Sequence, residues 1–212
     1  MDFLPTELQK YVEAHTSPET ELLRRINRET HLNILKPRML SGHLQGRVLA
    51  MLTQMIRPRY VLEIGTYTGY SALCMAEGMQ PGGKLVTIEV NEELATLTQG
   101  YFAESPFDEL IDFRIGDAQE IIPTLSYIWD MVFVDANKET YPQYFELILP
   151  QLRKGGFMII DNVLWSGKVT TDDQKDKATA SIKAFNQMVH DHPEVENVLF
   201  PIRDGLMVLR KI

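Results

Sequence analysis

The stretch Tyr60-Val-Leu-Glu-Ile-Gly-Thr-Tyr-Thr-Gly-Tyr-Ser71 decides the fold of this chain. A short apolar run ends at Gly65, and Gly69 opens a second segment whose apolar residues recur at helical spacing. Strand, glycine turn and helix in this order form the first unit of a doubly wound α/β domain, because glycine lets the backbone turn tightly and lets a ligand approach. The stretch therefore predicts a Rossmann-like α/β fold.

Two acids beside this turn indicate the kind of ligand. Glu63 lies just before the turn, where a negative charge disfavours a phosphate and favours a ligand that carries a cation. Glu89 ends the next apolar run, Lys84–Glu89, at the position from which a carboxylate binds a ribose hydroxyl. The glycine spacing G-x-x-x-G lacks one glycine of the dinucleotide fingerprint. Together these features favour S-adenosylmethionine over NAD.

The rest of the chain predicts a seven-stranded, mostly parallel sheet. Further strands are expected at Ile111–Ile115, Met131–Val134 and Phe157–Ile160, and an antiparallel C-terminal pair at Val195–Phe200 and Gly205–Leu209. Helices are expected at Leu44–Met55, Asn91–Ala103, Glu120–Leu125, Tyr141–Leu152 and Asp176–His190.

The N-terminal part belongs to no strand–helix unit. Residues 5–35 have an amphipathic helical pattern, and Ser17-Pro18 predicts a helix start. We expect this segment to cover the active site or to form a subunit contact. The expected organisation is one domain over residues 1–212, with a helical extension and an access loop over 1–56 and a Rossmann-like core over 57–212.

Composition narrows the class of protein. The 212 residues are 44% hydrophobic, enough for one core, and the net charge of −8 argues against a large basic nucleic-acid surface. Cys74 is the only cysteine, so no internal disulfide can form, and we expect it in the core. The start lacks a signal region and no run reaches membrane-spanning length, so a cytoplasmic protein is expected.

Polar residues follow two successive predicted strands. Asp135 follows Met131–Val134, and Asp161 and Asn162 follow Phe157–Ile160. Because successive strands are usually neighbours, these residues are expected side by side. Two carboxylates and an amide oxygen suit a hard divalent ion such as Mg²⁺, and a substrate with two adjacent oxygens would complete its coordination. The alternative is that each acid only caps the segment that follows it.

Two more side chains are candidates. Lys138 lies three residues beyond Asp135, and a divalent cation nearby would lower its pKa and make it a general base; the alternative is a solvated lysine. Asp117 follows the third strand and could accept a hydrogen bond from an adenine amino group, while Ala118 offers its backbone N–H. The alternative for Asp117 is a turn aspartate.

These residues resemble the cation-dependent class I O-methyltransferases, the family of caffeoyl-CoA and catechol O-methyltransferases. The matching segments are Glu63–Ser71, Val134–Lys138, Gly155-Gly156, Asp161–Gly167 and Pro201–Gly205. The caffeoyl-CoA branch and its bacterial relatives are most similar, because they share the helical N-terminal segment and the Asp-Asn-x-Leu-Trp pattern.

The resemblance implies S-adenosylmethionine and Mg²⁺ (or Ca²⁺ or Mn²⁺) as cofactors, and a homodimer. The methionine part would be bound by residues of the turn, its helix and the access loop, namely Met39, Ser41, Glu63, Gly65, Thr66, Tyr67 and Ser71. Glu89 would bind the ribose, and Asp117 and Ala118 the adenine. The metal would be held by Asp135, Asp161 and Asn162, with Lys138 as the general base beside Asp135.

The implied reaction is methyl transfer to a hydroxyl of a catechol- or caffeoyl-type small molecule with vicinal oxygens. Three departures concern the substrate. Ala136-Asn137 replaces the His-Trp pair of the catechol enzymes, the access loop Asn33–Gly46 is longer than in the plant enzymes, and Arg203 could contact an anionic substrate. The alternatives are a tRNA 5-hydroxyuridine O-methyltransferase, which also presents two adjacent oxygens, and a non-catalytic nucleotide- or metal-binding module.

Overall fold

The computed structural model describes residues 4–171 and 176–212. By its internal contacts the chain divides into two compact units, one formed by Glu7–Ala118 and the other containing Gln119–Ile212. We call them the N-terminal and the C-terminal unit. The single-domain organisation expected from the sequence stays a prediction.

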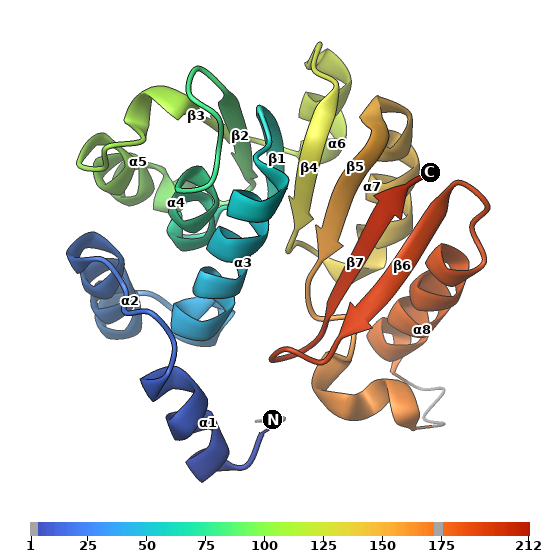
Figure 1. The fold of residues 1–212 in the computed structure, drawn as a ribbon, viewed down its shortest axis with the longest axis horizontal. Helices are drawn as coiled ribbons and strands as arrows, with labels where there is room; N and C mark the ends of the chain where they lie inside the picture. Colours follow the sequence, from blue (N-terminus) through green and yellow to red (C-terminus); the bar gives the residue numbers. More distant parts are fainter. Residues whose placement is uncertain (1–3, 172–175) are drawn as a thin grey trace. The chain divides into compact units, whose positions relative to one another are not determined.

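The N-terminal unit contains three parallel strands in the order β3-β2-β1 (Figure 1). They are β1 (Tyr60–Ile64), β2 (Lys84–Glu89) and β3 (Ile111–Ile115). Ile64 pairs with Ile88, and Glu89 pairs with Ile115, so the carboxyl ends of the three strands meet at one edge. These ends are the positions at which the sequence places Glu63, Glu89 and Asp117.

The helical segments of this part of the chain are, in chain order, α1 (Thr6–Ala14), α2 (Glu21–Asn33), η1 (Pro37–Met39), α3 (Gly42–Ile56), α4 (Tyr70–Ala76), η2 (Glu92–Leu94), α5 (Ala95–Ala103) and η3 (Asp108–Leu110). The prediction that a helix begins at Ser17-Pro18 is wrong. Thr20 is the N-cap of α2, and its hydroxyl accepts a hydrogen bond from the N–H of Leu23 at 3.3 Å.

The C-terminal unit contains four strands in the order β4-β5-β7-β6 (Figure 1). They are β4 (Trp129–Val134), β5 (Leu152–Ile160), β6 (Val195–Phe200) and β7 (Leu206–Lys211). Strand β4 is parallel to β5, whereas β7 is antiparallel to both β5 and β6. The expected antiparallel C-terminal pair is confirmed.

The helical segments of this part of the chain are α6 (Ala118–Ile121), η4 (Ile122–Thr124), η5 (Lys138–Thr140), α7 (Tyr141–Ile148), η6 (Leu149–Gln151), η7 (Trp165–Thr170) and α8 (Lys177–His190). The helix expected over Tyr141–Leu152 stops at Ile148, and a 3₁₀ turn that contains a proline follows. Strand β5 begins earlier than predicted and runs through Gly155, whose φ is +75°. Glycines within a strand mark irregular pairing, and the register of β4 and β5 shifts between Trp129 and Met131.

The seven strands confirm the expected fold class, a Rossmann-like α/β fold with mostly parallel strands and an antiparallel C-terminal pair. Strands β1 and β4 are almost wholly buried, as parallel strands covered on both faces should be. Among the described residues, no helix combines the length and the apolar character that crossing a bilayer requires.

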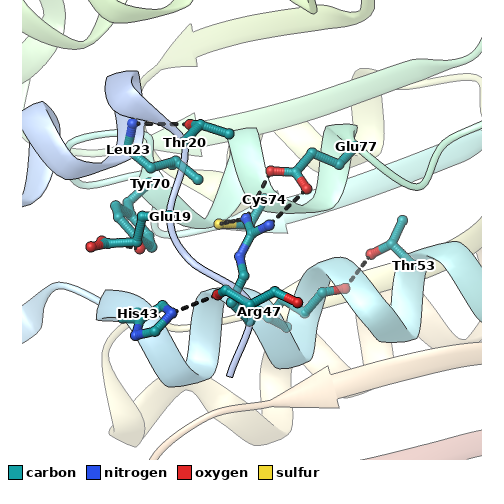
Figure 2. A network of polar contacts seen from close by, with 11 residues as sticks. Glu19, Thr20, Leu23, His43, Arg47, Thr53, Tyr70, Cys74 and Glu77 are labelled. Atoms are coloured by element: carbon teal, nitrogen blue, oxygen red, sulfur yellow. Dashed lines mark hydrogen bonds and ion pairs between the residues drawn. The ribbon is translucent and has the colours of Figure 1, made fainter. Parts of the chain in front are cut away.

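A partly buried polar contact joins α3 to the end of α4 (Figure 2). The guanidinium of Arg47 donates to both carboxylate oxygens of Glu77 at 2.9 and 2.7 Å, and it lies 3.4 Å from the sulfur of Cys74. Cys74 is fully buried, as predicted, and burial raises the pKa of its thiol to about 12 although Arg47 opposes the shift. The thiol is therefore a protonated core group at neutral pH.

The segment before α2 is attached to the same helices (Figure 2). The phenol of the buried Tyr70 donates to the Glu19 carboxylate at 2.6 Å, and the His43 imidazole lies 2.7 Å from the Ser17 carbonyl oxygen. Burial, foremost, raises the pKa of Tyr70, so this phenol stays a donor. The segment between α1 and α2 is therefore held to α3 and α4 by hydrogen bonds to their side chains.

Close packing of α3 on α4 gives a stability prediction. A Cβ at Gly46 would lie 2.6 Å from the ring of Tyr70 and 2.8 Å from the sulfur of Cys74, both buried. We expect Gly46→Ala to destabilise the protein by about 1–3 kcal/mol, measured by urea or thermal unfolding. Gly100→Ala is the matched control, because it lies on the exposed side of α5 with no atom within 4 Å of the position that a Cβ would take. It should leave stability unchanged or raise it by about 0.5–1 kcal/mol; equal losses in both variants would contradict the packing argument.

Candidate active site

The turn between β1 and α4 is built from left-handed backbone. Gly65, Tyr67 and Gly69 have φ values of +100°, +52° and +80°. The N–H groups of Gly65 and Thr66 both donate to the carbonyl of Ile88, which attaches the turn to the end of β2. A Cβ at Gly69 would lie 2.6 Å from the ring of Phe102, so only glycine fits where α4 begins.

The carboxylate of Glu63 is the centre of a buried hydroxyl network. It is fully buried and accepts hydrogen bonds from Ser71 at 2.5 Å and from Thr87. Because the Thr87 proton points to Glu63, the Thr87 oxygen accepts the hydrogen bond that joins it to Thr66 at 2.6 Å. Glu63 thus holds Thr66 and Ser71, on the two sides of the turn. Its own contact with a ligand stays a prediction.

Glu89 fixes the other side of the turn. One carboxylate oxygen accepts from the N–H of Tyr67 at 2.7 Å, and the other accepts from the N–H of Asn91 at 2.9 Å. A carboxylate offers about four acceptor positions, so it can bind ribose hydroxyls as well. The carbonyl of Glu89 accepts from the N–H of Gly116 at 2.9 Å, which places the exposed Asp117 and the buried Ala118 beside it in the chain.

The access loop is connected to the turn by Tyr67. Its phenol donates to the carbonyls of Leu35 and Lys36, each at 3.3 Å. Burial and, next, the charge of Glu89 raise the pKa of Tyr67, so the phenol remains a donor at neutral pH. In this loop Met39 is 56% exposed, whereas Ser41 is buried at the start of α3.

All ten residues predicted to bind the cofactor lie in the N-terminal unit. Hydrogen bonds join Glu63, Thr66 and Ser71 in one network, and Tyr67 and Glu89 in a second. Gly65 lies within the turn. Met39 and Ser41 come from the access loop, and Asp117 and Ala118 follow the end of β3.

The predicted metal ligands follow the paired ends of β4 and β5. Val134 pairs with Ile160, and the N–H of Asp161 donates to the Val134 carbonyl at 2.9 Å, so Asp135 and Asp161 leave adjacent strand ends. Asp161 is 3% exposed and accepts from the N–H of Asn162 at 2.6 Å. Two carboxylates and an amide oxygen fit Mg²⁺, which prefers oxygen ligands. No group of three or more His, Cys, Asp or Glu residues suited to a metal occurs in residues 4–171 and 176–212, and this mixed set is of another kind.

Lys138 is paired with Asp135. Its ammonium lies 2.9 Å from a carboxylate oxygen of Asp135, and its side chain is only 13% exposed. Burial acts to lower the pKa of Lys138, but the charge of Asp135 and the contact with Tyr141 outweigh burial and raise it. The direction is opposite to the expected lowering, because that expectation assumed a divalent cation at the acids.

Tyr141 is a site residue that sequence reasoning missed. It is 1% exposed, and its phenol donates to the backbone carbonyl of Asp161 at 2.8 Å. The Lys138 nitrogen lies 5.3 Å from the centre of its ring, within cation–π range. Burial, the largest cause, raises the pKa of Tyr141. The sequence did offer a signal, because Tyr141 lies three residues beyond the candidate base and begins a predicted helix. A tyrosine buried at such a position needs an acceptor for its hydroxyl.

Comparisons with known proteins identify the family of this chain. A family profile described as O-methyltransferase matches residues 13–212. The chain is 32% identical over 173 residues to the Catechol O-methyltransferase domain-containing protein 1 of Mus musculus, covering 79% of this chain and 66% of that protein. It is 30% identical over 208 residues to the Probable caffeoyl-CoA O-methyltransferase 2 of Dictyostelium discoideum, covering 95% of this chain and 90% of that protein.

A solved structure shows the same fold. The O-methyltransferase TomG from Streptomyces achromogenes, involved in tomaymycin synthesis and solved in complex with SAM, is 30% identical, with a TM-score of 0.87 over 97% of this chain and 96% of that chain. The chain therefore belongs to the O-methyltransferase family, which confirms the resemblance seen in its motifs. It spans just under two thirds of the length of the mouse relative.

The buried phenol of Tyr141 gives a prediction that needs no ligand. Tyr141→Phe removes the hydrogen bond that the buried phenol donates to the Asp161 carbonyl, so we expect a loss of about 0.5–1.5 kcal/mol in unfolding free energy. Tyr144→Phe, on the same helix, is the control, because its hydroxyl makes no hydrogen bond within the part of the chain that is described. Denaturant unfolding measures both; indistinguishable midpoints would show that the bond to Asp161 contributes nothing.

Proposed function

We propose that this protein is an S-adenosylmethionine- and divalent-metal-dependent O-methyltransferase. Its acceptor would be a hydroxyl of a small molecule with vicinal oxygens, of the catechol or caffeoyl type. The observation that carries the proposal is the set of Asp135, Asp161 and Asn162 at paired strand ends, with Lys138 bound to the first of them. The names of the mouse and Dictyostelium relatives support the substrate class, and the SAM bound to TomG supports the methyl donor.

S-adenosylmethionine, when bound, supplies a methyl group on a positively charged sulfonium, from which a neutral thioether leaves when the methyl group is transferred. The left-handed turn and its two acids would hold it. Glu89 would accept from the ribose hydroxyls, and Asp117 and Ala118 would bind the adenine. The hydroxyls of Thr66 and Ser71 and the side chains of Met39, Ser41, Glu63 and Tyr67 would surround the methionine part. The role of Glu63 is to keep Ser71 and Thr66 in place through the network described above.

Asp135, Asp161 and Asn162 would hold Mg²⁺, Ca²⁺ or Mn²⁺, and such an ion would stabilise negative charge on the acceptor oxygens. Lys138 would accept the proton of the hydroxyl at its nitrogen. The ion pair with Asp135 stabilises the protonated form of Lys138. If Asp135 bound a cation instead, that stabilisation would be lost and the lysine could accept a proton. The deprotonated oxygen would then form a bond to the methyl carbon as the sulfur–carbon bond breaks. Orientation and charge stabilisation would supply most of the rate.

The cellular context belongs to the same proposal. We infer a cytoplasmic protein that works as a homodimer on a small phenolic substrate. The net charge of −8 weighs against tRNA as the acceptor. No described side chain arrangement favours a non-catalytic module over an enzyme, since the candidate base and all three candidate ligands are present.

Methyl transfer from labelled S-adenosylmethionine tests the proposed activity. The acceptors are a panel of catechols and caffeoyl-type phenols and, in parallel, bulk tRNA, each with Mg²⁺ and with a chelator. Transfer to a phenol that the chelator abolishes is the expected result. Transfer to tRNA alone would replace the substrate, and transfer that persists with the chelator would remove the metal from the mechanism.

Lys138→Ala separates catalysis from cofactor binding. We expect kcat to fall about 10²- to 10⁴-fold, as for loss of a general base, while the affinity for S-adenosylhomocysteine, measured by calorimetry, changes less than about 3-fold. Lys154→Ala, an exposed lysine on β5, should change neither quantity. A kcat of Lys138→Ala within about 3-fold of the wild type would exclude Lys138 as the base.

A further inference from the structure

The segment that follows Asp161 contains several residues with left-handed backbone. Asn162, Trp165 and Ser166 have φ values of +60°, +47° and +54°, and Gly167 has +77°. Left-handed backbone is costly for residues that carry a side chain, most of all for a large one such as Trp165. It persists only where surrounding contacts hold it, and such residues cluster at functional sites. The residues that stabilise segment 162–167 are therefore candidates for a role in the site.

The loop between β6 and β7 supplies those contacts. Asp204 and Gly205 use their backbone carbonyls to accept from the N–H groups of Leu164 at 2.9 Å and Val163 at 3.2 Å. The side-chain carboxylate of Asp204 accepts a third hydrogen bond, from the N–H of Ser166. Three amides of the strained segment are thus bound by two adjacent residues.

The segment is also held by packing. A Cβ on Gly205 would lie 2.5 Å from the Leu164 side chain, so the loop and the segment are in close contact. On the side of α8, the side-chain amide of Asn186 donates to the Val163 carbonyl at 2.9 Å. Val163 itself is fully buried. Of these hydrogen bonds, only the one between Ser166 and Asp204 joins a side chain to a residue with left-handed backbone.

The charge of Asp204 connects it to the proposed catalytic group. Burial raises the pKa of Asp204, whereas the hydrogen bond from Ser166 and the positive charge of Lys138 oppose the rise. Lys138 is the residue that pairs with Asp135. The same carboxylate therefore holds the segment after Asp161 and interacts electrostatically with the lysine beside Asp135.

We propose that Asp204 is a positioning residue of the metal site, because its carboxylate binds the left-handed segment 162–167 and so helps to hold Asn162 where its amide oxygen would act as a ligand. The inference rests on the proposed function. Asn162 follows Asp161 directly, and its left-handed φ sets the direction in which its side chain leaves the backbone. Without the bond to Ser166 the segment keeps its backbone bonds at Val163 and Leu164 but loses the one at Ser166. We expect the left-handed residues, Asn162 among them, then to shift away from the orientation that a ligand needs.

The test compares Mn²⁺ binding by the wild-type chain, Asp204→Ala and Asp204→Asn, measured by calorimetry in the presence of S-adenosylhomocysteine. The alanine variant should bind Mn²⁺ about 10- to 100-fold more weakly, the usual cost of losing an outer-shell partner. The asparagine variant keeps an oxygen that can accept from Ser166 and should stay within about 3-fold of the wild type. Glu196→Ala, which removes an exposed acid paired with Arg210 across the same two strands, should bind as the wild type does.

Hydrogen exchange of the peptide that covers residues 160–171 gives a readout independent of metal. The amides should exchange faster in Asp204→Ala and at the wild-type rate in Asp204→Asn. If Asp204→Ala fails to fold by circular dichroism, Asp204→Ser replaces it, because the shorter side chain also lacks an oxygen at the carboxylate position.

The outcomes separate this inference from the proposed function. Wild-type Mn²⁺ binding with equal affinity in Asp204→Ala would overturn the positioning role and leave the metal site intact. Absence of Mn²⁺ binding by the wild type would overturn the metal-dependent function, and the positioning role with it. Faster exchange and weaker binding that Asp204→Asn restores would establish the role.

Discussion

The N-terminal unit depends on the buried carboxylate of Glu63. A carboxylate without exposed surface is tolerable only if its oxygens accept hydrogen bonds, and Ser71 and Thr87 provide them, with Thr66 donating to Thr87. These hydroxyls come from the turn after β1, from α4 and from β2. The need to satisfy one buried acid therefore determines how the turn, its helix and the neighbouring strand meet, and the turn's left-handed backbone is held from both sides.

The C-terminal unit meets a similar requirement with different groups. Asp135 is partnered by Lys138, while the backbone of Asp161 is bound by Val134 and Tyr141 and its carboxylate by the N–H of Asn162. Left-handed backbone follows at once, as it does after Glu63 in the other unit. In both units the chain turns sharply beyond the carboxyl end of a parallel strand, where open α/β sheets bind their ligands. Polar side chains and amides at that edge are left partly available because the strands have ended.

Sequence reasoning located most of the site because strand ends are recognisable. Apolar runs that stop at an acid or a glycine predicted β1, β2, β3 and β4 and thus the places of Glu63, Glu89, Asp117 and Asp135. It failed where local signals conflict with tertiary contacts. The glycine pair within β5 resembled a loop, and the cap of α2 is Thr20, whose side chain accepts from the N–H of Leu23, rather than Ser17. The pKa of Lys138 depends on which charges surround it, and Tyr141 and Asp204 act through bonds to residues 20 and 38 positions away in the chain.

The amino-acid sequence by itself determined the fold class, the family and the set of polar residues at the strand ends, because periodicity, glycines and acids are local features of the chain. Only the tertiary structure decided what each of these residues contacts. It turned Glu63 inward to the hydroxyls of Ser71 and Thr87, gave both oxygens of Glu89 to backbone amides, and placed Asp204 against the strained segment after Asp161. The physical reason is that a hydrogen bond needs a partner at a set distance and angle, and residues far apart in the chain reach that geometry only after the strands have paired.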